Sequence, residues 1–201
     1  MKRMVDRFTE CGFTYFDTAY TYHDFQSEVV LRKALVERYD RDRFTIATKV
    51  PSMILNVSAD LQRTFDEQLQ KLGVEYIDYY MMHNICATFY PIVEELDGFG
   101  FISEKKAEGK IRRIGFSFHD NADMLDRVLE EHPEVDFVQL RLNCLDWDNE
   151  SIQSRKCYEV AGKHGKEIIV MEPVKGGVLA KVPKTVEMLF KEAEPDMSVT
   201  S

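Results

Sequence analysis

The sequence predicts an α/β fold with a parallel sheet. Short apolar runs rich in aromatic and β-branched residues alternate with longer stretches of helical periodicity along the whole chain. Six such runs begin near residues 13, 44, 77, 111, 136 and 167. Intervals of that length suit strands that are joined through a helix by right-handed crossovers. The runs are almost continuously apolar, which is typical of strands covered on both faces.

The first half of the chain is expected to supply three strands, at residues 13–18, 44–50 and 77–83. Helices are expected at residues 1–11, 27–39 and 58–72, because apolar side chains recur there at intervals of three and four. Ser27 is placed to cap the start of the second helix, and Gly73 to end the third.

The second half repeats the pattern, with strands expected at residues 111–118, 135–143 and 167–174. Helices are expected at residues 91–106, 152–164 and 185–193. A further helix is expected to begin after a cap at Asp120 or Asn121. Gly98 and Gly100 interrupt the first of these helices, so we expect it to bend there.

Chemically reactive side chains stand at the C-terminal ends of the predicted strands. Asp17, Lys49, His83 and Ser117 each lie where an apolar run closes. A (β/α)8 barrel of the TIM type places its chemistry at that one face. An open doubly wound sheet is the alternative, but it gathers its ligand groups near one switch point rather than at every strand end. We therefore expect a TIM-type barrel that forms a single domain over residues 1–201.

The predicted barrel is incomplete. A closed eight-stranded barrel typically needs about 250 residues, whereas this chain has 201 residues and about six of the eight strands. The chain opens on a helix and stops shortly after its last helix, so truncation at both ends is expected. The first and last strands would then expose unpaired edges, through which copies of the chain could assemble into a homo-oligomer.

Composition and charge exclude several classes of protein. With 44% hydrophobic and 30% charged residues, the chain has an ordinary globular composition. A net charge of -9 argues against a broad nucleic-acid interface, although it permits a local basic pocket for one small anion. No run approaches the roughly 20 apolar residues of a membrane span, and the N-terminus is too polar for a secretion signal. We expect no nucleic-acid or membrane partner and a cytoplasmic location.

The four cysteines are too far apart to form a metal or redox motif. We expect them to be free thiols, and we expect Cys11 and Cys144 to be buried because they lie in or beside apolar runs. No metal site is expected.

Four residues at or just beyond the strand ends suggest carbonyl reduction when they are considered together, although each has an ordinary structural explanation alone. A carbonyl that accepts hydride develops an alkoxide, and this alkoxide needs a proton that Tyr22 could donate. An adjacent Lys49 ammonium, held by Asp17, would stabilise the phenolate and make Tyr22 a better acid. His83 would donate a hydrogen bond to the carbonyl oxygen and orient it.

Six motifs along the chain resemble, in order, those of the aldo-keto reductase family: FDTAYTY, ATKV, DYYMMHN, GFSFHD, FVQLRLN and MEPVKGG. The last motif makes the chain most similar to the bacterial branch whose members often carry an added iron-sulfur segment. The resemblance implies that the family's catalytic tetrad falls on Asp17, Tyr22, Lys49 and His83, with Tyr22 as the proton donor.

The same resemblance implies how a nicotinamide cofactor would be bound. Ser117 and Gln139 would hold the nicotinamide carboxamide, and backbone in the turn that contains Glu172, Gly176 and Gly177 would approach the phosphates. A glutamine in an otherwise apolar strand also needs a hydrogen-bond partner, which would be a ligand or a backbone group. The two glycines could equally form a plain turn.

The chain departs from the family at three places. Phe118 stands where many members have asparagine, and Glu172 stands where many have a tyrosine that stacks on the nicotinamide. The family's clamp on the adenosine end of the cofactor would lie beyond Ser201. These departures concern the geometry of cofactor binding rather than the tetrad.

The leading hypothesis is therefore hydride transfer from NADPH, with NADH as the alternative, to a small-molecule aldehyde or ketone. A second hypothesis is a catalytically impaired reductase remnant that acts as an oligomer-forming or binding module. A lyase that uses Lys49 as a Schiff base is disfavoured, because Asp17 would keep the lysine charged. The size of the protein in solution helps to separate the first two hypotheses.

Overall fold

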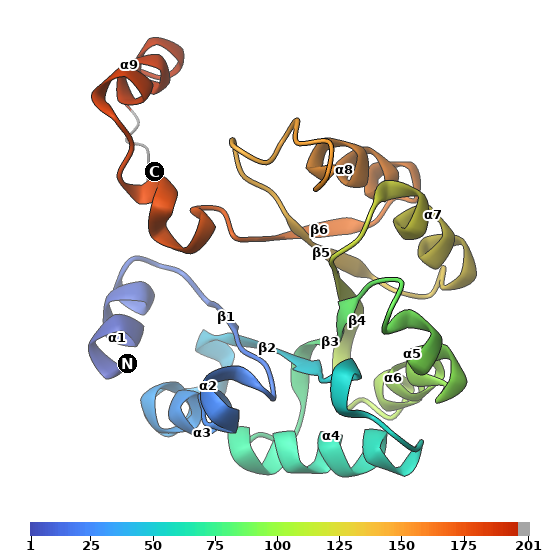
Figure 1. Ribbon diagram of the computed structural model, residues 1–201. Helices are drawn as coiled ribbons and strands as arrows, with labels where there is room; N and C mark the ends of the chain where they lie inside the picture. Colours follow the sequence, from blue (N-terminus) through green and yellow to red (C-terminus); the bar gives the residue numbers. More distant parts are fainter. Residues whose placement is uncertain (197–201) are drawn as a thin grey trace.

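A computed structural model describes residues 1–196 and contains one sheet of six parallel strands in sequential order. The strands are β1 Tyr15–Asp17, β2 Thr45–Val50, β3 Ile77–Ile85, β4 Ile111–Phe118, β5 Phe137–Arg141 and β6 Glu167–Met171. The sheet curls into an open half-barrel with helices α3 to α8 on its outer side (Figure 1). This arrangement confirms the predicted incomplete barrel of the TIM type, with six strands in place.

Most of the described helices connect successive strands, whereas the first precedes β1 and the last follows β6. The helices are α1 Lys2–Glu10, α2 Tyr22–Phe25, α3 Ser27–Leu31, α4 Ala59–Leu72, α5 Tyr90–Glu95, α6 Gly98–Ala107, α7 Ala122–Glu131, α8 Ser154–Lys163 and α9 Lys184–Ala193. A wider helical turn, Arg32–Val36, continues α3, and short 3-10 turns lie at Arg41–Arg43, Ser52–Ile54 and Lys175–Ala180. Within the described part of the chain, none of the helices combines the length and apolar character needed to cross a membrane.

Two of the predicted helix boundaries are confirmed and one is wrong. Gly73 ends α4 in a left-handed conformation, with its N–H donating to Leu69 O at 2.8 Å. Of the two caps proposed for α7, Asn121 is the one observed, because its side-chain oxygen accepts a hydrogen bond from the Met124 N–H. Ser27 is not a cap: it is the first residue of α3, and its hydroxyl accepts a hydrogen bond from Thr18 instead.

The expected bend in the stretch 91–106 occurs, but its cause differs from the predicted one. The chain breaks at residues 96–97, where Asp97 adopts a left-handed conformation with φ 55°. Gly98 lies inside α6, where a Cβ would come within 2.8 Å of both Met82 and Val93. The glycine is therefore required by close packing against β3 and α5 rather than by the bend.

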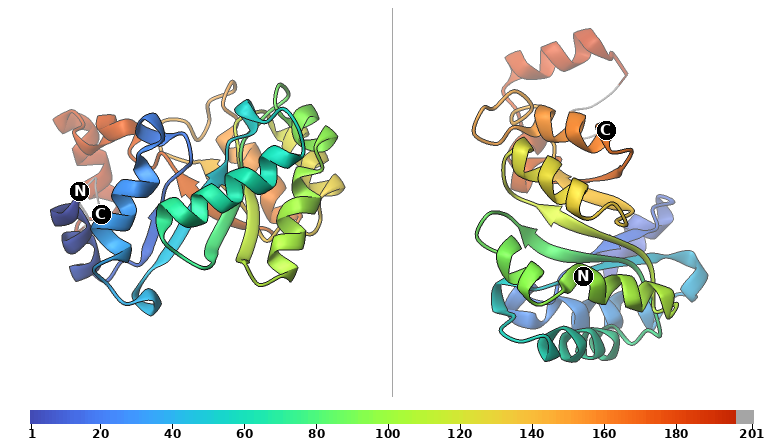
Figure 2. Two further views of the ribbon diagram at one scale, coloured as in Figure 1. Left: turned by 90° about the horizontal axis from the view of Figure 1, so that it is seen from below. Right: turned by 90° about the vertical axis from the view of Figure 1, so that its right-hand side faces the viewer.

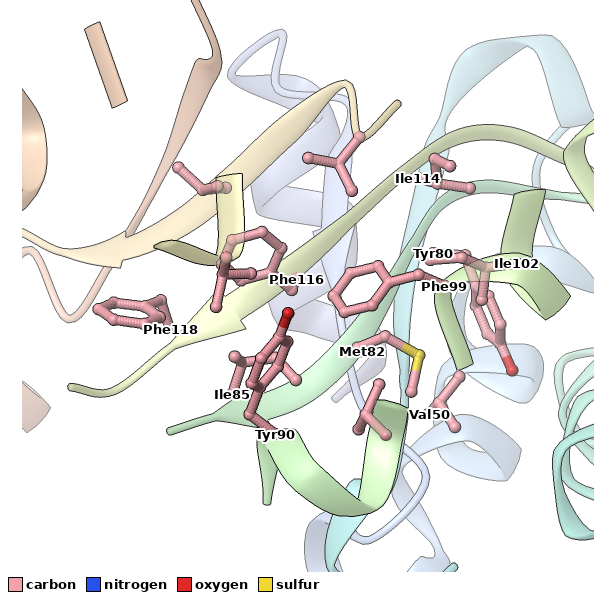
Figure 3. Close-up of a cluster of buried hydrophobic side chains, with 14 of the residues drawn as sticks. Val50, Tyr80, Met82, Ile85, Tyr90, Phe99, Ile102, Ile114, Phe116 and Phe118 are labelled. Atoms are coloured by element: carbon pink, nitrogen blue, oxygen red, sulfur yellow. The ribbon is translucent and has the colours of Figure 1, made fainter. Parts of the chain in front are cut away.

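The main hydrophobic core lies between the outer face of the sheet and helices α4 to α8. Tyr80 and Met82 of β3 point toward this core, together with Phe116 of β4 and Phe99 of α6 (Figure 3). A smaller cluster inside the curl is formed by Ala47, Met81 and Phe137. Strands β2 to β5 are thus covered on both faces, as their continuous apolar character predicted, whereas the edge strands β1 and β6 are only partly buried.

The four cysteines are free, as predicted, but their burial was assigned wrongly. Cys11 and Cys144 are exposed, whereas Cys157 is buried. Cys11 directly follows α1, and Cys144 lies in the loop after β5, so neither side chain reaches the core that its apolar neighbours join.

The half-barrel has two open edges. Among the described residues, β1 pairs only with β2 and β6 pairs only with β5. The opening is flanked by α1 on one side and by the C-terminal segment that carries α9 on the other (Figures 1 and 2). The predicted edge strands are therefore the observed ones.

Candidate active site

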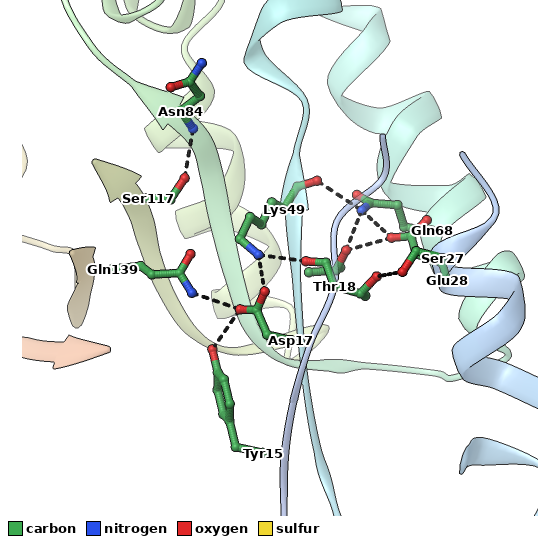
Figure 4. Close-up of polar contacts among 11 residues, drawn as sticks. Tyr15, Asp17, Thr18, Ser27, Glu28, Lys49, Gln68, Asn84, Ser117 and Gln139 are labelled. Atoms are coloured by element: carbon green, nitrogen blue, oxygen red, sulfur yellow. Dashed lines mark hydrogen bonds and ion pairs between the residues drawn. The ribbon is translucent and has the colours of Figure 1, made fainter. Parts of the chain in front are cut away.

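Asp17 and Lys49 form an ion pair at the C-terminal ends of β1 and β2. The Lys49 side chain is only 1% exposed, and its ammonium donates to the Asp17 carboxylate and, at 2.8 Å, to Thr18 O (Figure 4). The second carboxylate oxygen accepts from Gln139 Nε2 at 2.9 Å and from the Tyr15 hydroxyl at 3.3 Å. This ion pair is the one predicted from the sequence, and it places the Lys49 ammonium at the C-terminal ends of the strands.

Tyr22 lies beside Lys49, the basic member of this pair, and beside His83. Its ring centroid is 5.1 Å from Lys49 Nζ and 5.7 Å from the centroid of the His83 ring, which it meets edge-on at 77°. The Tyr22 side chain is 39% exposed. The loop after β1 therefore brings a phenol beside a buried ammonium and an imidazole, while part of the phenol stays open to solvent.

His83 is held in its neutral form. Burial, together with the smaller effects of the Lys49 and His119 charges, lowers its pKa from an ordinary value of 6.5 to about 3. Its Nδ1 is buried and has no hydrogen-bond partner among residues 1–196. A neutral imidazole carries one N–H, so His83 can act at neutral pH as a hydrogen-bond donor without adding a second positive charge next to Lys49.

A buried polar network lies behind Lys49 and was not predicted from the sequence. Gln68 Nε2 donates to Glu28 Oε1 at 2.7 Å and to Lys49 O at 3.2 Å (Figure 4). Gln68 Oε1 accepts from the Tyr80 hydroxyl at 2.7 Å. Thr48 Oγ1 also donates to Glu28 Oε1, and burial raises the pKa of Glu28. The network connects α3 and α4 to the strand that carries the lysine.

Ser117 and Gln139 are neighbours across β4 and β5, because their Cα atoms pair in register. Ser117 Oγ accepts from the Asn84 N–H at 2.9 Å, and a hydroxyl that accepts still has its proton to donate. The Gln139 amide nitrogen donates to Asp17, a partner other than the ligand or backbone group that was expected. The curl of the sheet explains this contact, since it brings β5 opposite β1.

The turn after β6 contains Glu172, Gly176 and Gly177 and has an unusual backbone. Positive φ angles occur at Glu172, Lys175, Gly176 and Gly177. A Cβ at either glycine would meet no atom within 4 Å, so both glycines face open space. Two residues that follow β5 hold the turn: the buried Asp146 pairs with Lys175, and Asn143 Nδ2 donates to Glu172 O at 3.3 Å.

Two cavities lie near the C-terminal ends of the strands. One, of about 270 Å³, lies between α1, β1 and α3 and is lined by Asp17 and Thr18. The other, of about 320 Å³, lies at the ends of β4 and β5 and is lined by His119 and Arg141. Burial lowers the pKa of His119, and the neighbouring Arg141 charge lowers it further. Of these two cavities, only the first is lined by a residue of the ion pair, Asp17.

The sequence profile described as the Aldo/keto reductase family matches residues 1–199. Among curated proteins, the NADH-specific methylglyoxal reductase of Escherichia coli is 29% identical over 188 residues, which are 84% of this chain and 55% of that protein. The chain spans about half the length of the curated relatives it matches.

Solved structures of the same family have a similar fold. An aldo-keto reductase from Bacillus halodurans, in its holo form, gives a TM-score of 0.68 at 27% identity and covers 90% of this chain and 58% of that chain. A thermostable aldo-keto reductase in complex with the inhibitor epalrestat gives a TM-score of 0.76 at 24% identity, covering 97% of this chain and 69% of that chain. These relatives are (β/α)8 barrels, of which the present half-barrel matches six strands.

Proposed function

The chain belongs to the aldo/keto reductase family, and on this premise we propose that it reduces an aldehyde or ketone with Tyr22 as the proton donor. The observation that carries the proposal is the buried Lys49 ammonium, which is paired with Asp17 and lies 5.1 Å from the Tyr22 ring centroid. Family membership supports a reductase that depends on a nicotinamide cofactor. The role of each residue is our inference from its contacts.

The proposed chemistry assigns one task to each tetrad residue. Tyr22 transfers its hydroxyl proton to the carbonyl oxygen as negative charge develops there. Lys49 stabilises the phenolate that remains, and Asp17 keeps the Lys49 ammonium in place. The neutral His83 donates a hydrogen bond to the same oxygen and aligns the carbonyl. The only charged residues that these steps use are Lys49 and Asp17, which form the ion pair.

The cofactor end of the site fits a nicotinamide carboxamide. Such a group has one acceptor and one donor side, and the adjacent Ser117 and Gln139 offer a hydroxyl proton and an amide oxygen. When bound there, a reduced nicotinamide would supply the hydride. The resemblance favours NADPH, whereas the name of the Escherichia coli relative favours NADH, so we propose both as candidates to be compared.

The test is a titration of the protein with NADPH and with NADH, followed by Trp147 fluorescence and calorimetry, and then an assay of methylglyoxal reduction. We expect saturable binding of one cofactor and turnover that Tyr22→Phe lowers at least a hundredfold without changing cofactor affinity. Tyr76→Phe is the matched control, since Tyr76 lies just before β3, at the opposite end of the sheet. Equal turnover in Tyr22→Phe and the wild type would refute the assignment.

A second candidate function is assembly through the open edges. Large apolar side chains are exposed beside both of them: Met4 and Phe13 near β1, and Val170 and Val178 in or after β6. Unpaired edges next to apolar surface favour strand pairing between chains. Sedimentation of the purified protein tests this candidate: a stable oligomer without cofactor binding would favour it, and a monomer that binds cofactor would exclude it.

A further inference from the structure

The loop that carries Tyr22 includes the short turn α2, whose backbone is left-handed and strained instead of regularly α-helical. The three residues that follow Tyr22 are His23, Asp24 and Phe25, and all three adopt left-handed conformations with φ of 52°, 53° and 64°. None of them is glycine, and consecutive left-handed L-residues are rare because Cβ approaches the following carbonyl oxygen. A segment of this kind persists only when surrounding contacts hold it.

The base of the loop is fixed to the active site. Thr18 Oγ1 donates to Ser27 Oγ at 2.7 Å, which ties the two ends of the loop together. Thr18 O accepts from the Lys49 ammonium at 2.8 Å. These contacts fix the two ends of the loop but do not involve residues 20–25 in its middle.

The middle of the loop is held against α4 by four side chains, which we name the α4 clamp: Tyr20, Phe25, Glu67 and Lys71. The rings of Tyr20 and Phe25 meet edge-on at 5.4 Å, and Lys71 Nζ lies 3.8 Å from the Tyr20 centroid and 5.9 Å from the Phe25 centroid. The Tyr20 hydroxyl donates to Glu67 Oε2 at 2.6 Å. Glu67 and Lys71 are one helical turn apart, so both grip the loop from one face of α4.

We propose that the α4 clamp positions Tyr22 for proton transfer, which makes Lys71 and Glu67 positioning residues for the reaction. Tyr22 lies in sequence between the two aromatic members of the clamp. Release of Phe25 would let residues 23–25 relax into a right-handed or extended conformation, and this relaxation would move the phenol away from Lys49 and His83. The catalytic consequence rests on the proposed function, whereas the position of the Tyr22 ring does not.

The first test measures that position without turnover. In the wild type, Tyr22 and His83 ring protons should give a nuclear Overhauser effect, because the ring centroids are 5.7 Å apart. Lys71→Met should abolish it, and Lys71→Arg, which keeps a cation over the rings, should retain it. Lys163→Met is the control, since it removes an exposed lysine of α8. An unchanged effect in Lys71→Met would overturn the proposal.

The second test compares Phe25→Gly with Phe25→Ala. Both lose the aromatic ring, but only glycine adopts a positive φ without strain. We expect kcat to fall about tenfold further in the alanine variant than in the glycine variant, at unchanged cofactor affinity, because small displacements of a catalytic group are costly. Equal kcat values would overturn the proposal. An inactive wild type would refute the proposed function instead, and the nuclear Overhauser measurement would still decide whether the clamp holds Tyr22.

Discussion

Removal of the Asp17 carboxylate should destabilise the protein mainly through its effect on Lys49. The lysine is 1% exposed, and in Asp17→Asn its ammonium would lose its carboxylate partner and keep only neutral acceptors, Thr18 O and the introduced amide oxygen. Breaking one member of a buried ion pair costs about 3–5 kcal/mol. Because the Asp17 side chain is 29% exposed and Thr18 O remains, we expect the lower end, about 3 kcal/mol.

The reverse deletion should cost less. In Lys49→Met the buried charge is gone, and Asp17 keeps its hydrogen bonds from Gln139 and Tyr15 as well as its partial exposure. We expect a loss of about 1 kcal/mol. The double variant carries neither charge and should be more stable than Asp17→Asn alone, with a coupling energy of about 2 kcal/mol between the two positions.

The assay is urea unfolding of the four proteins at one pH, followed by far-UV circular dichroism, with equal m-values required for the comparison. The exposed pair Glu187 and Lys191 on α9, with side chains 45% and 58% exposed, is the control and should couple by less than about 0.5 kcal/mol. If Asp17→Asn costs under about 1 kcal/mol, or if the double variant is no more stable than Asp17→Asn, then Lys49 is not held as a buried charge and the basis of the proposed function fails.

Three further outcomes are expected. Folding lowers the pKa of His83 from 6.5 to about 3, so protonation of His83 favours the unfolded state. The free energy of unfolding should therefore be highest above pH 6.5 and fall as the pH drops toward 3, by about 2 kcal/mol at pH 5. Urea unfolding of His83→Gln should lack this pH-dependent loss. Gly98→Ala should cost about 2 kcal/mol, because its Cβ would lie 2.8 Å from Met82 and Val93. Gly162→Ala in α8, where a Cβ meets nothing within 4 Å, should instead stabilise the protein by up to about 1 kcal/mol in thermal unfolding.

Much of the fold followed from pattern and spacing. Strand-like runs separated by helical periodicity placed all six strands, and the polar residues that closed those runs, such as Asp17, Lys49 and His83, were found at one end of the sheet. These features depend on local sequence and on the rule that parallel strands present the same end together. The Asp17 and Lys49 pair could be predicted for the same reason.

Contacts that depend on curvature or on loop conformation could not be predicted. Gln139 reaches Asp17 only because the sheet curls until β5 faces β1. The residue types of His23 to Phe25 do not predict three consecutive left-handed residues, since His and Asp adopt this conformation only more often than most residues and Phe normally avoids it. The buried network around Gln68, by contrast, could have been predicted from the sequence. Gln68 lies between Phe65 and Leu72 on the apolar face of α4, where a polar side chain needs a buried hydrogen-bond partner.

Helix α4 contacts the segments that carry two of the proposed catalytic residues, Lys49 and Tyr22, by two separate routes. On its inner face Gln68 bonds to the carbonyl of Lys49, and farther along Glu67 and Lys71 hold the loop of Tyr22. Tyr22, the proposed acid, and Lys49, which we propose activates it, therefore share one support, although they come from different segments of the chain. The consequence is epistasis: substitutions on α4 should combine non-additively with substitutions in the loop, because both act on the same interatomic spacing. A library that diversifies residues 18–27 for new substrates should vary α4 with them, or leave both unchanged.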